Sequence, residues 1–257
     1  MTPYQQFKQE CEQEIEAIGR DKSLVAVTHD WIRRMNEKKY TYHFEWFGRP
    51  IIQYPQDIVA MQELIWHVKP DLIIETGIAH GGSLIFSASM LAQLDMCDAI
   101  EAGTTLDPKK SSRLVIGLDI RAHNRTEIEA HPMASRIKML QGSSVAPDVV
   151  AEVKKIATDY KRILVCLDSN HTHEHVLAEL EAYAPLVTPD SYCVVFDTLI
   201  EDMPEGSFSD RSWRRGGNPK TTVWEYLKTH PEFVIDKSID HKLPISVAPD
   251  GYLKRIG

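Results

Sequence analysis

The sequence has few cysteines, and their spacing excludes a crosslinked framework. Cys11, Cys97, Cys166 and Cys193 are scattered along the 257 residues, and two of them lie inside apolar runs. This arrangement does not fit a disulfide scaffold or a cysteine zinc site, and it is typical of buried thiols in a reducing compartment. We therefore predict a cytoplasmic protein.

Long apolar runs and an excess of positive charge are also missing. No apolar run reaches the roughly 18 residues of a membrane span, so we expect none. Residues 1–19 are polar and helix-prone, unlike a signal peptide. A net charge of −8 argues against a nucleic-acid-binding face, which needs clustered lysines and arginines. The composition, 43% hydrophobic and 26% charged, suits one large soluble domain with an extension at one end.

The pattern along the chain predicts two parts. Residues 1–50 combine helical spacing over 4–39 with the start of an aromatic stretch at 42–55, and we interpret them as an extension that caps the core or joins subunits into a homo-oligomer. Residues 51–257 alternate strands and helices, which predicts a doubly wound, mostly parallel, Rossmann-like sheet. Expected strands are 72–75, 114–118, 137–140, 163–167, 192–196, 233–235 and a final pair up to 256. Expected helices are 57–68, 83–94, 124–130, 147–158, 174–184 and 220–228, with loops at 95–113 and 199–219.

The most informative segment is a strand that ends in a carboxylate, followed by a glycine turn and a helix. It runs from Leu72 through Glu75, Gly77, Gly81 and Gly82 to Ser83. The glycine spacing differs from Gly-x-Gly-x-x-Gly, and a carboxylate two residues before the first glycine would repel a pyrophosphate. Glu75 suits a ligand with an ammonium and a sulfonium, so we predict S-adenosylmethionine (SAM) along Glu75–Ser83.

Acidic residues follow three further predicted strands: Asp119, Asp168 and Asp197. Ligands of open α/β sheets lie beyond the carboxyl ends of the strands, and four carboxylates there, Glu75 included, need cations to offset their repulsion. We expect Asp119 to bind the cofactor ribose. Ser143 and Ser144, in a small polar turn, fit its ribose or adenine.

The segment Asp168-Ser-Asn-His171 predicts catalytic chemistry. A carboxylate at the mouth of the sheet can bind a divalent ion, and a nearby histidine can accept a proton at neutral pH. We expect Asp168, Asp197 and Glu201 (or Asp202) to bind Mg²⁺, because hard oxygen ligands favour it. His171 is the predicted base. Zinc held by alternating histidines is the less favoured alternative, since His171, His173 and His175 do not share one helix face; His173 and His175 are interpreted as solvated or capping residues.

The loop Ser212–Lys220 mixes a tryptophan, three cations and two glycines. Such a loop can close over a substrate and bind its anionic groups, and it can equally be ordinary surface.

Several motifs together resemble the cephalosporin hydroxylase / rhamnosyl O-methyltransferase-like group of SAM-dependent methyltransferases. They are Pro55-x-Asp57, Lys69-Pro70-Asp71, Glu75-Thr76-Gly77 with Gly81-Gly82-Ser83, Leu167-Asp168-Ser169 with His171-Thr172, Gly216-Gly217-x-Pro219 and the closing Gly251–Arg255. The resemblance implies a class I methyltransferase fold over 51–257 and, in many relatives, Mg²⁺-assisted transfer to a hydroxyl. The resemblance implies that Asp168 is the carboxylate that binds the metal and that it also lies beside the cofactor. It implies that His171 is the general base. Relatives usually carry two adjacent oxygen ligands where this chain has Phe196-Asp197.

We therefore expect a SAM-dependent O-methyltransferase acting on a small-molecule hydroxyl: a sugar, nucleotide sugar or other phosphorylated acceptor, glycolipid or natural product. Two alternatives stay open. One is an NAD-dependent oxidoreductase of the same fold class, and the other is an inactive SAM-binding or interaction subunit.

Overall fold

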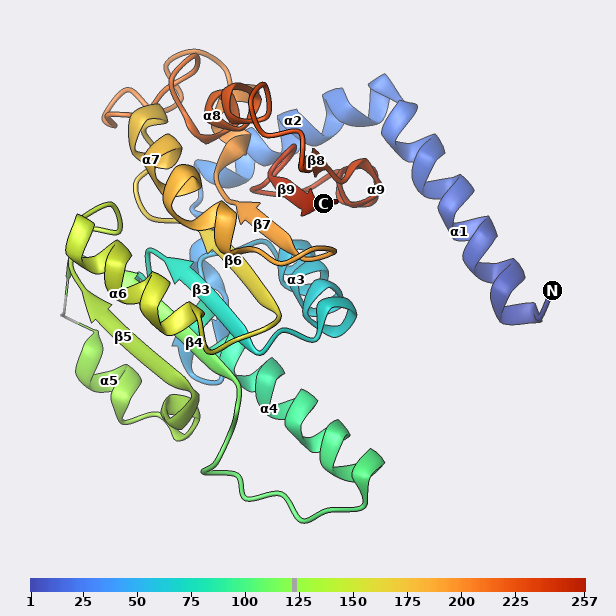
Figure 1. Cartoon of the computed structure of the whole chain (residues 1–257). Coiled ribbons are helices and arrows are strands. Elements are labelled where there is room, and N and C mark those ends of the chain that lie inside the picture. Colours follow the sequence, from blue (N-terminus) through green and yellow to red (C-terminus); the bar gives the residue numbers. More distant parts are fainter. Residues whose placement is uncertain (122–123) are drawn as a thin grey trace.

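A seven-stranded sheet forms the centre of the molecule (Figure 1). The computed structural model describes residues 1–121 and 124–257. The strands are β3 (Leu72–Thr76), β4 (Leu114–Asp119), β5 (Ile137–Gln141), β6 (Ile163–Leu167), β7 (Tyr192–Val195), β8 (Phe233–Ile235) and β9 (Tyr252–Arg255). Their spatial order is β5-β4-β3-β6-β7-β9-β8. The strands β3 to β7 pair in parallel, and β9 is antiparallel to both β7 and β8. The predicted mostly parallel sheet is confirmed.

Helices cover both faces of this sheet, because successive apolar side chains along a strand point to opposite faces and each face must be buried. In β3, Ile73 packs into one core cluster with α3 (Pro55–Val68) and α4 (Gly82–Ala102), while Leu72 and Ile74 pack into a second. That second cluster includes α6 (Pro147–Ala157), α7 (His173–Tyr183) and α8 (Pro219–Tyr226). Central parallel strands that are buried on both faces read as continuous Leu/Ile/Val runs, which is why they were predictable.

Helix α4 is the one described helix long and apolar enough to cross a membrane, and 56% of its most apolar window is buried inside the protein. Its apolar residues are accounted for by packing against the sheet.

The N-terminal segment lies outside the sheet. It contains α1 (Pro3–Arg20), α2 (Lys22–Asn36), the 3₁₀ turn η1 (Tyr40–His43) and the hairpin β1 (Glu45–Trp46) and β2 (Arg49–Pro50). Helix α1 has no buried residue, contacts α9 (Lys237–Lys242) and projects from the body (Figure 1). Part of the aromatic stretch packs inward: the rings of Trp46 and Phe86 lie 4.9 Å apart, and Trp46 Nε1 donates to Ser89 Oγ. Tyr42 and Phe47 of the same stretch are exposed. The division of the chain at residue 50 stays a prediction.

Two expected boundaries are wrong. Residues 95–102 continue α4 where a loop was expected, because the polar Asp95 is buried in ion pairs with Arg113 and Arg136. Near the C-terminus, residues 237–242 form α9, capped by Asp236, where a strand was expected. The remaining elements are α5 (Arg125–Glu129), η2 (Pro132–Arg136), η3 (Ala184–Leu186) and η4 (Thr198–Asp202).

Candidate active site

A cavity of about 1160 Å³, called the main cavity below, opens over the carboxyl ends of β3 to β7. It is large enough for a nucleoside ligand and a second molecule, since single-ligand pockets usually measure about 300–1000 Å³. Its lining includes nine of the predicted site residues: Gly77, Gly82, Ser83, Asp119, Ser143, Ser144, Asp168, His171 and Asp197. Glu75, Gly81 and Glu201 are not in this lining.

The glycine turn owes its shape to close backbone approaches. Gly77 has φ +78°, and a Cβ there would lie 2.0 Å from the carbonyl oxygen of Asp168. Only glycine lets β3 end against the loop that follows β6. A Cβ on Gly82 would lie 2.2 Å from the carbonyl oxygen of Pro50, so the start of α4 touches the N-terminal hairpin.

Asp119 and Ser144 connect the ends of β4 and β5 to neighbouring elements. Asp119 Oδ2 accepts from the backbone N–H of Ile78 at 3.2 Å, so this carboxylate faces the glycine turn. Ser144 is buried, its Oγ lies 3.0 Å from His175 Nε2, and its carbonyl oxygen accepts from the Tyr183 hydroxyl. Both residues stand where a nucleoside in the main cavity would reach them.

Glu75 lies deeper, in a second cavity of about 30 Å³ that we call the inner cavity. Gln53, Asp57, Asp168 and Phe196 line it too. Glu75 is 3% exposed and accepts from Ser83 Oγ, and burial raises the pKa of its carboxyl to about 7. Because Ser83 and Asp168 line both cavities, the inner cavity adjoins the main one.

Asp57 is the other fully buried carboxyl of the inner cavity. It accepts from Ser246 Oγ at 2.6 Å, the Val247 N–H at 2.9 Å and the Tyr252 hydroxyl at 2.9 Å. Burial raises its pKa to about 6. These three donors tie α3 to the C-terminal strand region.

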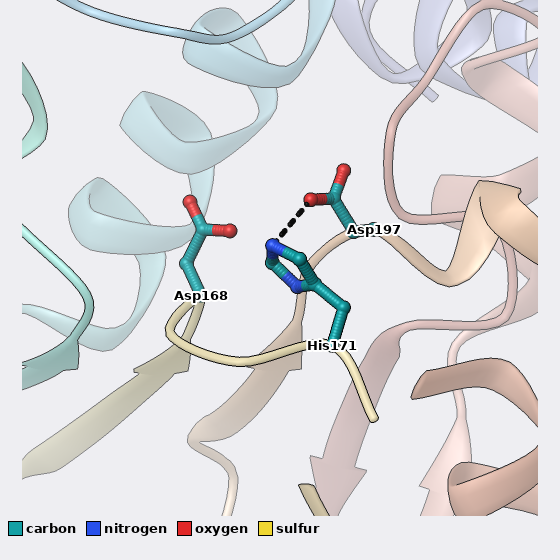
Figure 2. A group of neighbouring side chains, drawn as sticks. All are labelled: Asp168, His171 and Asp197. Carbon is teal, nitrogen blue, oxygen red and sulfur yellow. Dashed lines mark ion pairs between the residues drawn. The ribbon is translucent and has the colours of Figure 1, made fainter. Parts of the chain in front are cut away.

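Asp168, His171 and Asp197 converge at the floor of the main cavity (Figure 2). One ligand atom of each lies within 4.8 Å of the others, and His171 Nε2 is 3.0 Å from Asp197 Oδ2. Asp197 has φ +57°, a left-handed conformation that is rare outside glycine and typical of functional sites. The loop after β6 and the turn after β7 therefore bring together three residues that the sequence predicted.

The charges of this group depend on one another. Burial raises the pKa of Asp168 well above its usual range, and the charge of Asp197 adds to the effect. Burial alone would lower the pKa of His171, but Asp197 outweighs it and the net shift is upward. Burial alone would raise the pKa of Asp197, but His171 holds it below its usual range. Two half-buried carboxylates with this repulsion suit a cation, and two carboxylates with one imidazole are suitable ligands for a divalent metal.

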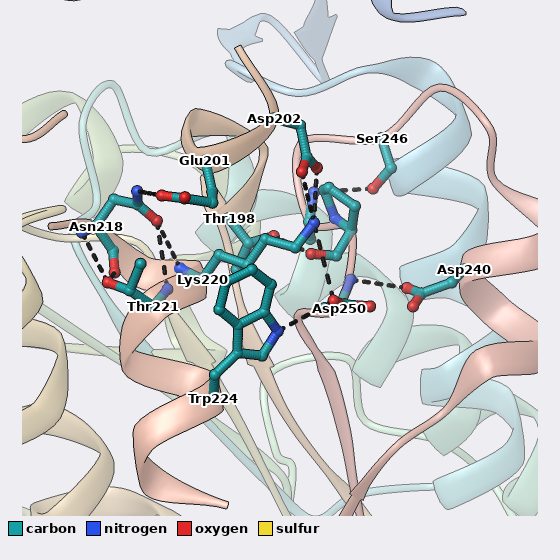
Figure 3. Close-up of polar contacts among 12 residues, drawn as sticks. Thr198, Glu201, Asp202, Asn218, Lys220, Thr221, Trp224, Asp240, Ser246 and Asp250 are labelled. Carbon is teal, nitrogen blue, oxygen red and sulfur yellow. Dashed lines mark hydrogen bonds and ion pairs between the residues drawn. The ribbon is translucent and has the colours of Figure 1, made fainter. Parts of the chain in front are cut away.

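Glu201 and Asp202, the residues predicted to supply a third metal ligand, have other partners in this structure (Figure 3). Glu201 Oε2 accepts from the Gly216 N–H at 2.7 Å and from Asn218 Nδ2 at 2.6 Å. Asp202 pairs with the buried Lys220, with 2.7 Å between Oδ2 and Nζ. These residues fasten the loop before α8 and do not join the acid–histidine group.

That loop still reaches the site. The Trp213 ring meets His171 edge to face with centroids 4.8 Å apart, and the Arg211 guanidinium lies over the indole ring, 5.4 Å from its centroid. Arg211 and Trp213 line the main cavity, whereas Arg214 and Arg215 do not. Its movement as a lid stays a prediction.

Comparison with known proteins identifies the family. The model of the rhamnosyl O-methyltransferase/CmcI family matches residues 38–256. The chain belongs to this family. A rhamnosyl O-methyltransferase of Mycobacterium leprae is 25% identical over 212 residues, 82% of each chain. One of Mycobacterium tuberculosis (strain ATCC 25618 / H37Rv) is 26% identical over 202 residues, 77% of this chain and 73% of that protein.

Solved structures share the fold. An apo structure of CmcI has a TM-score of 0.55 and 18% identity, covering 84% of this chain and 77% of that one. A CmcI structure with Mg and SAM has a TM-score of 0.55 and 16% identity, covering 84% and 78%. Family membership confirms the resemblance and the predicted class, a SAM-dependent O-methyltransferase, and decides against the NAD-dependent oxidoreductase. The cytoplasmic location stays a prediction.

Within this rhamnosyl O-methyltransferase/CmcI chain, three residues near the site were missed or misjudged. His175, expected to be solvated, lines the main cavity and lies 3.2 Å from Ser169 Oγ. Glu179 is fully buried and accepts from Ser169 Oγ at 2.6 Å. Gln53 contacts Asp168. The His175–Glu179 spacing of four residues was a usable signal, whereas nothing local marked Gln53.

Proposed function

We propose that this protein methylates a hydroxyl of a sugar-containing acceptor with the help of Mg²⁺. The observation that carries the proposal is the convergence of Asp168, His171 and Asp197 at the floor of a cavity with room for cofactor and acceptor together. The names of the mycobacterial relatives support a sugar hydroxyl.

The cofactor side is the glycine turn and the adjacent strand ends. SAM supplies an activated methyl group, whose carbon–sulfur bond breaks as the acceptor oxygen attacks the carbon. Glu75 and Ser83 would bind its cationic amino-acid part, Asp119 would accept from its ribose hydroxyls, and Ser143 and Ser144 would border the nucleoside. Gly77 and Gly82 would border it in the main cavity, and Gly81 (φ +85°) permits the turn.

Asp168 and Asp197 would hold the metal, because their carboxylate oxygens suit a hard cation and a cation relieves their repulsion. When bound, Mg²⁺ would lower the pKa of an acceptor hydroxyl and orient it. That a CmcI structure holds both Mg and SAM supports this choice of ion.

His171 serves as the base. Asp197 orients the imidazole through Nε2 at 3.0 Å, and the Trp213 ring packed on it limits access of water. The acceptor hydroxyl gives its proton to the imidazole while its oxygen takes the methyl group, so the products are a methyl ether and S-adenosylhomocysteine (SAH). Because the donor is already activated, positioning by these side chains accounts for much of the acceleration.

The acceptor lies under the loop that carries Arg211 and Trp213. The aromatic face suits a sugar ring, and Arg211 at the cavity wall suits a phosphate on a nucleotide sugar or other phosphorylated acceptor. The same cavity has room for a glycolipid head group or a glycosylated natural product.

Self-association through α1 is also part of the proposal. Tyr4 and Phe7 are 67% and 58% exposed on a projecting helix, and Cys11 continues the same stripe at helical spacing. Burying this stripe against a second copy gives a homo-oligomer.

An assay of SAH formation tests the function. Purified protein is incubated with SAM and a panel of rhamnosides, nucleotide sugars and glycolipids, with Mg²⁺ or with EDTA. We expect turnover with a sugar acceptor that EDTA abolishes and Mg²⁺ restores, and that Asp168→Asn eliminates. Turnover that EDTA leaves unchanged would contradict the metal. SAM binding without turnover on any acceptor would favour the inactive subunit.

A further inference from the structure

Phe196 leaves the proposed metal site short of an oxygen ligand. It stands between β7 and Asp197, is 6% exposed and lines the inner cavity beside Asp168. Its ring offers no ligand atom. Glu201 and Asp202 are fastened to other partners, so the described acidic residues contribute two carboxylates to this site.

Gln53 has an unsatisfied carboxamide beside Asp168. It follows the N-terminal hairpin, is 7% exposed and lines both cavities. Its Nε2 makes one long contact, 3.4 Å to Asp168 Oδ2, and its buried Oε1 has no hydrogen-bond partner within 1–121 and 124–257. Leaving a buried acceptor without a partner destabilises the protein, so this oxygen calls for a ligand.

Charge makes a neutral ligand preferable here. Asp57, Glu75 and Asp168 already line the inner cavity. Another carboxylate would add to their mutual repulsion in a buried place, whereas a carboxamide supplies a hard oxygen without charge. Rotation about the terminal side-chain torsion exchanges Oε1 and Nε2, which brings the oxygen to the side that faces Asp168.

We propose that Gln53 Oε1 is the third protein oxygen ligand of the divalent ion, beside Asp168 and Asp197. This inference rests on the proposed metal-assisted function. It makes the segment joining the hairpin to α3 part of the metal site.

Direct metal binding tests the proposal without relying on activity. Mn²⁺ serves as a paramagnetic probe for Mg²⁺, and its affinity is measured by calorimetry and electron paramagnetic resonance in the presence of SAH. We expect Gln53→Leu to weaken Mn²⁺ binding at least about tenfold, the lower range seen when groups supporting a metal site are removed. Water-proton relaxation should show additional water on the bound ion. Gln53→Glu, which keeps an oxygen ligand, should bind Mn²⁺ at least as tightly as the original protein.

A matched control is available three residues away. Gln56 also has a buried Oε1 without a partner in the described chain, but it lines neither cavity. Gln56→Leu should leave Mn²⁺ affinity unchanged, and thermal melting of each variant checks folding.

The outcomes separate this inference from the proposed function. If Asp168→Asn loses Mn²⁺ while Gln53→Leu keeps it, the Gln53 assignment is overturned and the metal-assisted reaction stands. If Gln53→Leu weakens SAH and not Mn²⁺, Gln53 belongs to the cofactor site and the assignment again fails. If the original protein binds no Mn²⁺, both proposals fail. If Gln53→Leu does not fold, weak Mn²⁺ binding by a folded Gln53→Glu variant overturns the assignment.

Discussion

Replacing Glu75 by glutamine tests whether the charge of this carboxylate, in the inner cavity next to the main one, contributes to SAM binding. The change keeps the size of the side chain and an acceptor for Ser83 Oγ, and it removes the charge. A hydrogen bond to a charged group contributes about 1.5–3 kcal/mol. At pH 8, where Glu75 is mostly ionised, we therefore expect SAM to bind roughly 10- to 100-fold more weakly to the variant.

The pH dependence gives a sharper signature. Burial raises the pKa of Glu75 to about 7, so its ionised fraction rises about tenfold between pH 6 and pH 8. SAM affinity of the original protein should rise with pH by up to this factor, and that of Glu75→Gln should stay flat. Calorimetric titration at several pH values measures both.

The stability of the unliganded protein should fall as pH rises, whereas its affinity for SAM should rise. A folded-state pKa raised from 4.5 to about 7 means that the folded protein holds this proton more tightly than the unfolded chain. The contribution of Glu75 to the free energy of unfolding is fully present below pH 4.5 and is lost as pH rises through 7. The loss is about 3 kcal/mol, because one pKa unit corresponds to about 1.36 kcal/mol. Glu75→Gln should therefore be more stable than the original protein at pH 8 and equal to it at pH 4, as measured by urea unfolding without ligand.

Asp57→Asn is the matched control. Burial raises the pKa of Asp57 to about 6, so this variant should also change the pH dependence of stability. Its three donors are protein groups, so SAM affinity should not change. Equal SAM binding by Glu75→Gln and the original protein at pH 8 would refute the role of Glu75.

Further substitutions test the remaining roles. His171→Ala should reduce turnover roughly 10²–10⁴-fold with SAM affinity unchanged; normal turnover would remove it from the mechanism. Asp197→Asn should lose most turnover with the metal ligand. The turnover that remains at high Mg²⁺ should show its rise of kcat/KM at lower pH, because burial lowers the pKa of His171 and Asp197 more than reverses that shift; an unmoved profile would count against the pair. Glu179→Leu should raise the KM for SAM more than it lowers kcat, because Glu179 supports Ser169 and, through His175, Ser144; an unchanged KM would make the network merely structural. Phe7→Glu should shift the sedimentation coefficient of the protein toward that of the monomer. If the variant and the original protein sediment alike, α1 has no role in self-association.

Much of the site followed from chain order because parallel strands share one edge. Asp119, Asp168 and Asp197 each stand at a strand end, so a correct strand assignment was sufficient to place them together. Gln53 and Glu179 were not predictable in this way, since one enters from the N-terminal side and the other from a helix face, and neither belongs to a strand end. The position of Glu201, four residues after Asp197, did not reveal the partners of its carboxylate. Its partners, Gly216 and Asn218, lie on a loop whose course the sequence does not indicate.

The place of β9 in the sheet has a consequence for how the protein is made. This strand, residues 252–255, is inserted between β7 and β8, and Tyr252 at its start donates to Asp57. During translation, β7 and the turn with Asp197 therefore emerge from the ribosome well before the neighbour that supports them. A nascent chain arrested before residue 252 would expose one edge of β7 to other chains, so the methyltransferase becomes competent only after β9 has been made.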